Sequence, residues 1–97
     1  MKVRITSRGC PVCGNLDFAA LEANGAVTDE ICPCCGVQSG YEYQPDVDES
    51  YLSELRARWF IENRGVWWSS SRKPPPGWRA RDQLIKAGIP VPTHENA

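Results

Sequence analysis

The sequence CPVCG at residues 10–14 returns as CPCCG at residues 32–36, so the pattern Cys-Pro-x-Cys-Gly occurs twice in a chain of 97 residues. Aligning the two copies places Cys34 opposite Val12, between the paired cysteines of the second copy. Two cysteines separated by two residues can turn both sulfurs toward one ion, and two such pairs complete a tetrahedral shell of four thiolates. The alignment therefore predicts one metal site and leaves Cys34 outside it.

The residue types and the spacing C-x2-C-x18-C-x2-C are typical of zinc. Proline fixes one backbone angle of each turn, and the glycine after the second cysteine can adopt a positive φ. We expect one structural Zn²⁺ ion, with iron able to substitute because rubredoxin-like sites use similar turns. The four expected ligands are Cys10, Cys13, Cys32 and Cys35.

A thiol redox protein is a rival interpretation of the same cysteines. It would use Cys10 with Cys13, or Cys34 with Cys35, as an exchanging pair. Such motifs lie at a strand-to-helix junction in a larger α/β unit, which this sequence does not supply. No basic residue stands within four positions of Cys34 to lower its pKa. We therefore expect a structural role and no enzymatic activity.

A length of 97 residues suits one small domain, which gains only modest stability from its core without a metal or disulfides. No apolar run typical of a signal peptide follows the charged start MKVRITSRGC, and no stretch approaches the roughly 18 apolar residues of a membrane span. We expect a cytoplasmic protein, and in that compartment clustered cysteines bind metals more often than they form disulfides.

The predicted fold class is small α+β, beginning with a zinc ribbon over residues 1–44. In a zinc ribbon the two metal-binding turns lie at the edge of a sheet, here of three to four antiparallel strands. Residues 2–6 alternate polar and apolar, as in a half-buried strand. Asn24-Gly25 is typical of a hairpin turn, and residues 38–43 are expected to form a further strand.

Residues 45–88 are expected to pack on the ribbon within the same compact domain. Asp46 or Asp48 would cap an amphipathic helix of about 15 residues, whose apolar side includes Trp59. Asn63-Arg64-Gly65 should end that helix.

A Trp- and Pro-rich extended segment and a short helix complete the predicted domain. The triple proline in residues 74–76 forces an extended path. The short helix is expected from about residue 79 to residue 87, and residues 89–97 should form a flexible tail.

Charge divides the chain into an acidic and a basic half. Three bases and eight acids give residues 1–50 a charge of −5, whereas eight bases and four acids give residues 51–97 a charge of +4. All four tryptophans lie in the basic half. Adjacent residues of an extended segment face opposite sides, so one of Trp67 and Trp68 should point outward. The candidate partner-binding residues are Trp67, Trp68, Arg64, Arg72 and Lys73.

Three functions are compatible with this pattern. The first is a zinc-stabilised, non-catalytic module that binds another protein, because Trp and Arg dominate interface hot spots. The second is a nucleic-acid-binding ribbon that uses the basic half, although a sequence pI near 5.8 weighs against it. The third is the thiol redox protein. No membrane partner is expected.

The chain resembles small, mostly uncharacterised bacterial proteins related to the cysteine-rich CPCC zinc-ribbon family. The residues that carry the resemblance are CPVCG (10–14), ICPCCG (31–36), GYEY (40–43), LRARWFIENRGVWWS (55–69) and PPPGWRARDQL (74–84). The resemblance implies a bacterial zinc ribbon. Some CPCC-type proteins are immunity partners of bacterial toxins, so it also implies a protein-binding task. The acidic-aromatic segment usual after the second CPCC turn is not matched, because Val37-Gln38-Ser39 stands there.

Overall fold

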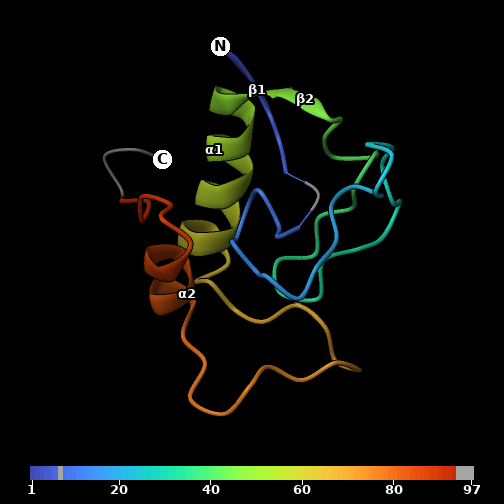
Figure 1. Ribbon diagram of the computed structural model, residues 1–97. Coiled ribbons are helices and arrows are strands. Elements are labelled where there is room, and N and C mark those ends of the chain that lie inside the picture. The colour runs from blue at the N-terminus through green and yellow to red at the C-terminus, as the bar shows by residue number, and fades with distance from the viewer. Residues whose placement is uncertain (7, 94–97) are drawn as a thin grey trace.

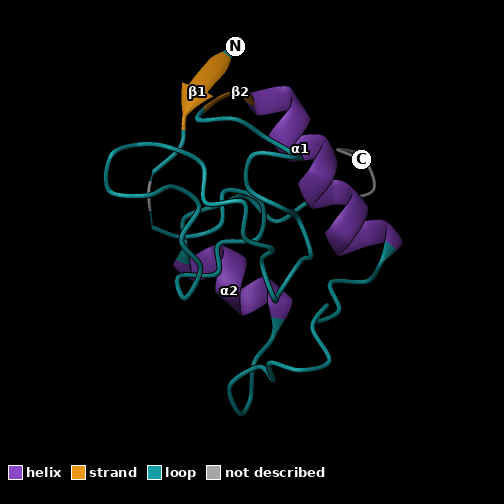
Figure 2. Cartoon of the chain, turned by 90° about the vertical axis from the view of Figure 1, so that its right-hand side faces the viewer, coloured by secondary structure: helices purple, strands orange, loops and turns teal. Residues whose placement is uncertain are grey.

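The computed structural model describes residues 1–6 and 8–93. Its elements follow the order β1 (Lys2–Arg4), β2 (Asp46–Asp48), α1 (Glu49–Ala57), the π-helical turn η1 (Arg58–Glu62) and α2 (Ala80–Lys86). In Figure 1 the cysteine-bearing loops lie beside α1, and the chain after η1 passes beneath them to reach α2. Figure 2 shows these loops between the β1–β2 pair and α2. The α+β character is therefore as expected from the sequence.

The sheet consists of two antiparallel strands that are distant in sequence. Val3 of β1 is paired with Val47 of β2. Arg4 is paired with Asp46, and their charged groups are 3.2 Å apart at the exposed surface. Cross-strand pairs of this kind add only modestly to stability. The pairing joins the beginning of the chain to the segment that leads into α1.

The expected ribbon sheet of three to four strands is not formed by the described residues. Between residues 8 and 43 the pairing is limited to isolated bridges, which are Arg8–Ala19, Leu21–Val27, Ile31–Gln38 and Ser39–Tyr43. Side chains take the place of a backbone ladder. The Thr28 hydroxyl donates to the carbonyl of Ala19 at 2.9 Å, and the Ser39 hydroxyl donates to the carbonyl of Ala20. These bonds span 9 and 19 residues of chain and satisfy the two carbonyls without a strand partner.

The expected Asn24-Gly25 turn closes a short hairpin in this region. The N–H of Glu22 donates to the carbonyl of Ala26 at 2.7 Å. Gly25 has a φ of 89°, and a Cβ added there would meet nothing within 4 Å. The turn therefore needs glycine for its backbone angle alone.

Asp48 caps α1, one of the two aspartates expected to do so. Its carboxylate accepts a hydrogen bond from the N–H of Ser50 at 3.0 Å, and bonding from Ser50 lowers the pKa of Asp48. The nine residues of α1 and the five of η1 together match the expected length. Leu52, Leu55 and Trp59 are buried along one side of them. The helix is amphipathic, as its periodicity predicts.

The helical segment ends where the sequence predicts. The N–H of Asn63 donates to the carbonyl of Arg58 at 3.0 Å, which closes the π-helical turn. Arg64 and Gly65 follow with φ angles of 58° and 61°. A Cβ on Gly65 would lie 2.9 Å from the Cβ of Ala80, so glycine also permits the close approach of the first residue of α2.

The extended segment packs through its tryptophans. The rings of Trp67 and Trp78 meet edge to face with their centroids 5.2 Å apart. After α2, the N–H of Ile89 donates to the carbonyl of the fully buried Leu84 at 3.0 Å, and Ile89 and Val91 pack against the core. Residues 94–97 of the expected tail lie outside the described residues.

One buried cluster takes side chains from both halves of the chain. Phe18 and Tyr43 from the loops pack in the same core as Leu55 from α1 and Leu84 from α2, and the cysteines belong to it. The cysteine cluster is therefore part of the hydrophobic core. Among the described residues, no helix has the length and apolar character needed to cross a membrane.

Candidate metal centre

We call residues 10–14 the first knuckle and residues 32–36 the second knuckle. In the first, the N–H of Gly14 donates to the carbonyl of Cys10 at 2.9 Å, and the N–H of Cys10 donates to the carbonyl of Asn15 at 3.0 Å. Gly14 has a φ of 83°, a conformation that favours glycine.

The second knuckle repeats this pattern position by position. The N–H of Gly36 donates to the carbonyl of Cys32 at 2.8 Å, and the N–H of Cys32 donates to the carbonyl of Val37 at 2.8 Å. Gly36 has a φ of 82°. The two copies of the sequence pattern therefore fold into the same local structure.

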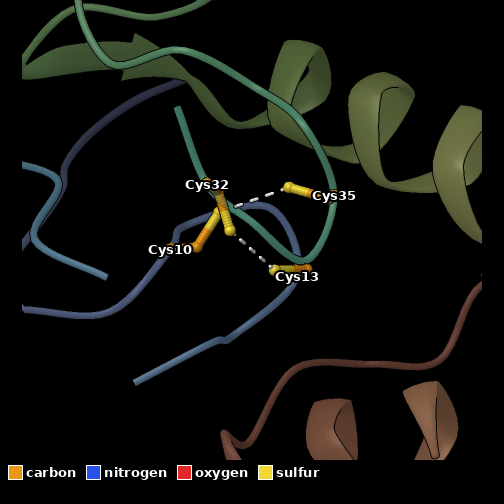
Figure 3. Close-up of side chains that lie close together, drawn as sticks. All are labelled: Cys10, Cys13, Cys32 and Cys35. Carbon is orange, nitrogen blue, oxygen red and sulfur yellow. Dashed lines mark hydrogen bonds between the residues drawn. The ribbon is translucent and has the colours of Figure 1, made fainter. Parts of the chain in front are cut away.

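The four predicted ligands converge. The sulfurs of Cys10, Cys13, Cys32 and Cys35 all lie within 4.8 Å of one another. Cys10 and Cys35 have their sulfurs 3.6 Å apart, as do Cys13 and Cys32, so both close contacts cross from one knuckle to the other (Figure 3). In a tetrahedral shell with Zn–S bonds of about 2.3 Å, neighbouring sulfurs are about 3.8 Å apart. The arrangement fits one tetrahedrally coordinated metal ion.

All five cysteines are free thiols. Cys13 and Cys32 are fully buried, and Cys10 is only 2% exposed. Thiol exchange requires a sulfur that a substrate can reach. Cys35, the fourth cysteine of the cluster, is partly exposed.

Contacts within the cluster shift the pKa values of three of its thiols, and not all in the same direction. Hydrogen bonding with Cys10 is the main cause in each case: it raises the pKa of Cys13 and Cys35 and lowers the pKa of Cys32. Opposite pKa shifts within one cluster mark a conflict between neighbouring thiols, because buried like charges disfavour one another. A bound cation would remove this conflict, since metals are ligated by thiolates.

Tyr43 is a buried neighbour of the cluster. Burial chiefly, and then the charges of Cys10 and Cys35, raise the pKa of its phenol. Its hydroxyl has no hydrogen-bond partner among the described residues. Tyr43 therefore stays neutral beside the sulfurs at physiological pH.

The fifth cysteine, Cys34, lies outside the four-sulfur cluster, as the alignment predicts. It is fully buried, like Val12 at the equivalent position of the first knuckle. Its sulfur accepts a hydrogen bond from the side-chain amide of Gln83 at 3.3 Å. Cys34 therefore fills the core and holds one contact to α2.

Gln83 connects both knuckles to the Trp- and Pro-rich segment. Its Nε2 donates to the sulfur of Cys34 and, at 2.9 Å, to the carbonyl of Cys13. Its Oε1 accepts from the indole N–H of Trp78 at 2.8 Å. These partners fix the orientation of the amide, because an indole can only donate and a carbonyl can only accept.

The outer carbonyls of the two knuckles are bonded by different groups. In the first knuckle, the carbonyls of Pro11 and Val12 accept from the guanidinium of Arg56 at 2.8 and 2.7 Å. The equivalent carbonyls of the second knuckle are those of Pro33 and Cys34. They accept from the backbone N–H groups of Ser69 at 2.8 Å and Trp68 at 2.9 Å.

The five candidate partner-binding residues differ in exposure. Trp67 is half-buried against Trp78, whereas Trp68 is 56% exposed, so the prediction that one of the pair points outward is confirmed. The indole of Trp68 also covers Gly36, where an added Cβ would lie 2.6 Å from the ring. The remaining three residues, Arg64, Arg72 and Lys73, are exposed.

A groove of about 670 Å³ lies between the turn after the first knuckle and α2. Its lining includes Trp67, Trp78 and Gln83. Leu16 and Ile85 line it as well and are 59% and 57% exposed. The groove therefore offers apolar surface next to the cysteine cluster.

Arg56 and Gln83 are two site residues that the sequence did not reveal. Both are polar positions on helices, and nothing in their spacing relates them to the cysteines. One feature of the sequence sets Arg56 apart, because it is the first base after Arg8 in the chain.

Comparisons of the chain with protein-family models, with curated proteins and with solved structures found no match.

Proposed function

We propose that the protein is a zinc-stabilised, non-catalytic module of the bacterial cytoplasm that binds another protein. The observation that carries the metal part is the convergence of four cysteine sulfurs, three of them from buried residues. A shell of four thiolates suits Zn²⁺, and iron is the metal most able to replace it. Metal analysis of protein purified without added metal should find one zinc per chain. Protein that neither contains nor takes up a stoichiometric metal ion would refute this part.

The charge distribution supports a basic partner. Residues 9–48, which precede α1, contain seven acids and no base. The next base along the chain, Arg56, is half-buried against the first knuckle. A surface dominated by one sign of charge speeds association with a partner of the opposite sign and selects against others.

Exposed apolar side chains supply the contact area that a protein interface needs. Tyr41 is 82% exposed within the acidic stretch, and Trp68 is 56% exposed beside the second knuckle. Large aromatic residues are enriched in interface cores. The groove lined by Leu16 and Ile85 adds further apolar surface.

The resemblance to CPCC zinc-ribbon proteins adds a class of partner. Immunity proteins bind toxins, and a basic toxin domain such as a nuclease would complement the acidic stretch. The proposed role is therefore that of an immunity-like binding protein, with the metal holding the binding surface in shape.

Charge reversal separates a specific acidic surface from a general effect of net charge. The double variant Glu22→Lys with Glu30→Lys changes two exposed acids of the loops, and Glu54→Lys with Glu62→Lys changes two exposed acids of the helical segment by the same total charge. A stoichiometric protein partner, captured after nuclease treatment, should be lost with the first variant and kept with the second. Equal retention by both variants would contradict the proposed surface.

Nucleic-acid binding by the basic half is the alternative. Residues 64–86 contain six bases and one acid. Among the described residues none of these bases forms an ion pair. If the alternative holds, the protein will retain DNA or RNA in a salt-dependent manner, and Arg72→Gln with Lys73→Gln will weaken that retention.

A further inference from the structure

Arg56 reaches the metal centre from the last turn of α1. Its Nε donates to the carbonyl of Val12, and its Nη2 donates to the carbonyl of Pro11. Bonds of 2.7 and 2.8 Å from a charged fork are short, as expected for charge-assisted hydrogen bonds. One side chain therefore holds two consecutive carbonyls of the first knuckle.

These bonds fix more than the two carbonyl groups. The peptide unit is planar, so fixing the carbonyl of Pro11 also fixes the N–H of Val12, and fixing the carbonyl of Val12 fixes the N–H of Cys13. The carbonyl of Cys13 is itself bonded by Gln83. The peptide planes that set the direction of the Cys13 sulfur are thus held by two side chains that come much later in the chain. The bonded residues are 44, 45 and 70 positions apart.

Arg56 also brings a positive charge to a site that needs one. Four thiolates around a divalent ion carry a net charge of −2, and burying such a charge without a counter-ion is costly. The guanidinium is half-buried, and burial is the main influence on its pKa, which it lowers, while the charges of Cys10 and Cys13 act in the opposite direction. A guanidinium keeps its proton under these conditions.

We propose that Arg56 is a positioning residue of the metal centre, which orients the first knuckle and supplies the permanent positive charge that offsets the four thiolates. The inference rests on metal binding at the cluster, but it is independent of the identity of any partner. It assigns to α1 a direct influence on how firmly the ion is held.

Arg58 provides a matched control. It lies on the same helical segment, is exposed, and forms no hydrogen bond or ion pair among residues 1–6 and 8–93 through its side chain. Zinc-loaded protein is mixed with excess EDTA, and the rate of zinc transfer is measured for the wild type, Arg58→Met, Arg56→Met, Arg56→Gln and Arg56→Lys. Loss of partners that orient metal ligands typically weakens metal binding about 10- to 100-fold. We expect release about tenfold faster or more for Arg56→Met, no change for Arg58→Met, and an intermediate rate for Arg56→Lys.

Cobalt spectra distinguish the charge from a purely structural role. A nearby cation lowers the energy of the thiolate lone pairs, so its removal should move the sulfur-to-cobalt charge-transfer bands to longer wavelength. In Co²⁺-loaded protein we expect this shift for Arg56→Met and Arg56→Gln. The bands of Arg56→Lys, which keeps the positive charge, and of Arg58→Met should lie at the wild-type wavelengths. If Arg56→Met does not fold, the Gln and Lys variants carry the same comparison.

The possible failures can be told apart. A wild-type protein that binds neither zinc nor cobalt would refute the metal centre itself. Wild-type protein that holds one ion, with equal release rates and unshifted bands in the Arg56 and Arg58 variants, would overturn the role of Arg56 and leave the metal centre standing. Faster zinc release from the Arg56 variants with unshifted cobalt bands would show that the charge of Arg56 does not act on the thiolates, and this result would also contradict the proposal.

Discussion

The first and second knuckles share their sequence pattern and their internal hydrogen bonds, but the rest of the protein holds them by different means. The first is held by side chains, from Arg56 and Gln83. The second is held at the equivalent carbonyls by the backbone of Trp68 and Ser69. The repeated motif thus determines the local geometry of each knuckle, whereas the contacts that hold a knuckle in the fold depend on the segment packed against it.

This difference has a practical meaning for substitutions. Side-chain bonds can be deleted by one mutation, but backbone N–H groups are retained by every residue except proline. We therefore expect the first knuckle to be the more sensitive of the two to changes elsewhere in the chain.

The largest effect is expected from removing one ligand of each knuckle. Cys10→Ser and Cys32→Ser occupy equivalent positions and should abolish stable metal binding to the same extent. Structural zinc contributes roughly 10–16 kcal/mol of apparent binding energy in small modules, as much as the whole stability of a typical domain. Both variants should lose cooperative thermal unfolding, as should the wild type in strong chelator. Circular dichroism would check this, and a variant that unfolds cooperatively in chelator would contradict it.

Substituting alanine for Gly14 or Gly36 tests how tightly each knuckle is packed against its neighbour. Both have positive φ, which costs a non-glycine residue about 1–2 kcal/mol. A Cβ on Gly14 would lie 2.7 Å from the Cβ of Ala87, whose backbone closes α2, whereas a Cβ on Gly36 would meet the ring of Trp68. The exposed ring can move more easily than a helix end. Gly14→Ala should therefore lower the free energy of unfolding of the zinc-loaded protein more than Gly36→Ala.

Gly25→Ala is the control for backbone strain. Gly25 has the same sign of φ, but a Cβ there would meet no neighbour within 4 Å. Its cost in denaturant unfolding should be smaller than that of either knuckle glycine. Equal costs at all three positions would show that the close approaches of Ala87 and Trp68 contribute nothing.

Cys34→Val makes the second knuckle match the first. Val12 fills the equivalent buried position, so the variant should still bind one zinc. It loses the hydrogen bond from Gln83, and we expect a decrease of about 1 kcal/mol in unfolding free energy. Zinc content and denaturant unfolding would check both points. Loss of zinc from this variant would instead make Cys34 a ligand.

The smallest effect on metal retention is expected from Trp68→Ala. This change removes the exposed indole but keeps the backbone N–H that donates to Cys34. Its rate of zinc release to EDTA should stay close to that of the wild type. A rate as high as that of Arg56→Met would show that the second knuckle depends on a side chain as well.

The sequence was sufficient for the ligand cluster and for the main helix. Cys10 and its three partners could be found because the chemistry of a four-thiolate site demands a repeated spacing. The helix could be found because Leu52, Leu55 and Trp59 recur at helical intervals between a capping aspartate and Gly65. These signals are local, so one sequence contains them.

The strands and the supporting residues could not be predicted in the same way. The position of Thr28 after the Asn24-Gly25 turn is compatible with a strand, but only the fold shows that its hydroxyl bonds a carbonyl in place of a ladder partner. Arg56 and Arg58 are equally basic and only two positions apart. Two positions along a helix point to nearly opposite sides, and only tertiary packing determines which side meets the knuckle.

The bond between Gln83 and Cys13 spans 70 residues of chain. A ribosome therefore completes both thiol pairs well before it makes the residues that brace them. An ion captured early in synthesis would sit in a partly supported cage and exchange readily with other carriers. Its retention would tighten only when α2 docks, because Gln83 lies on that helix.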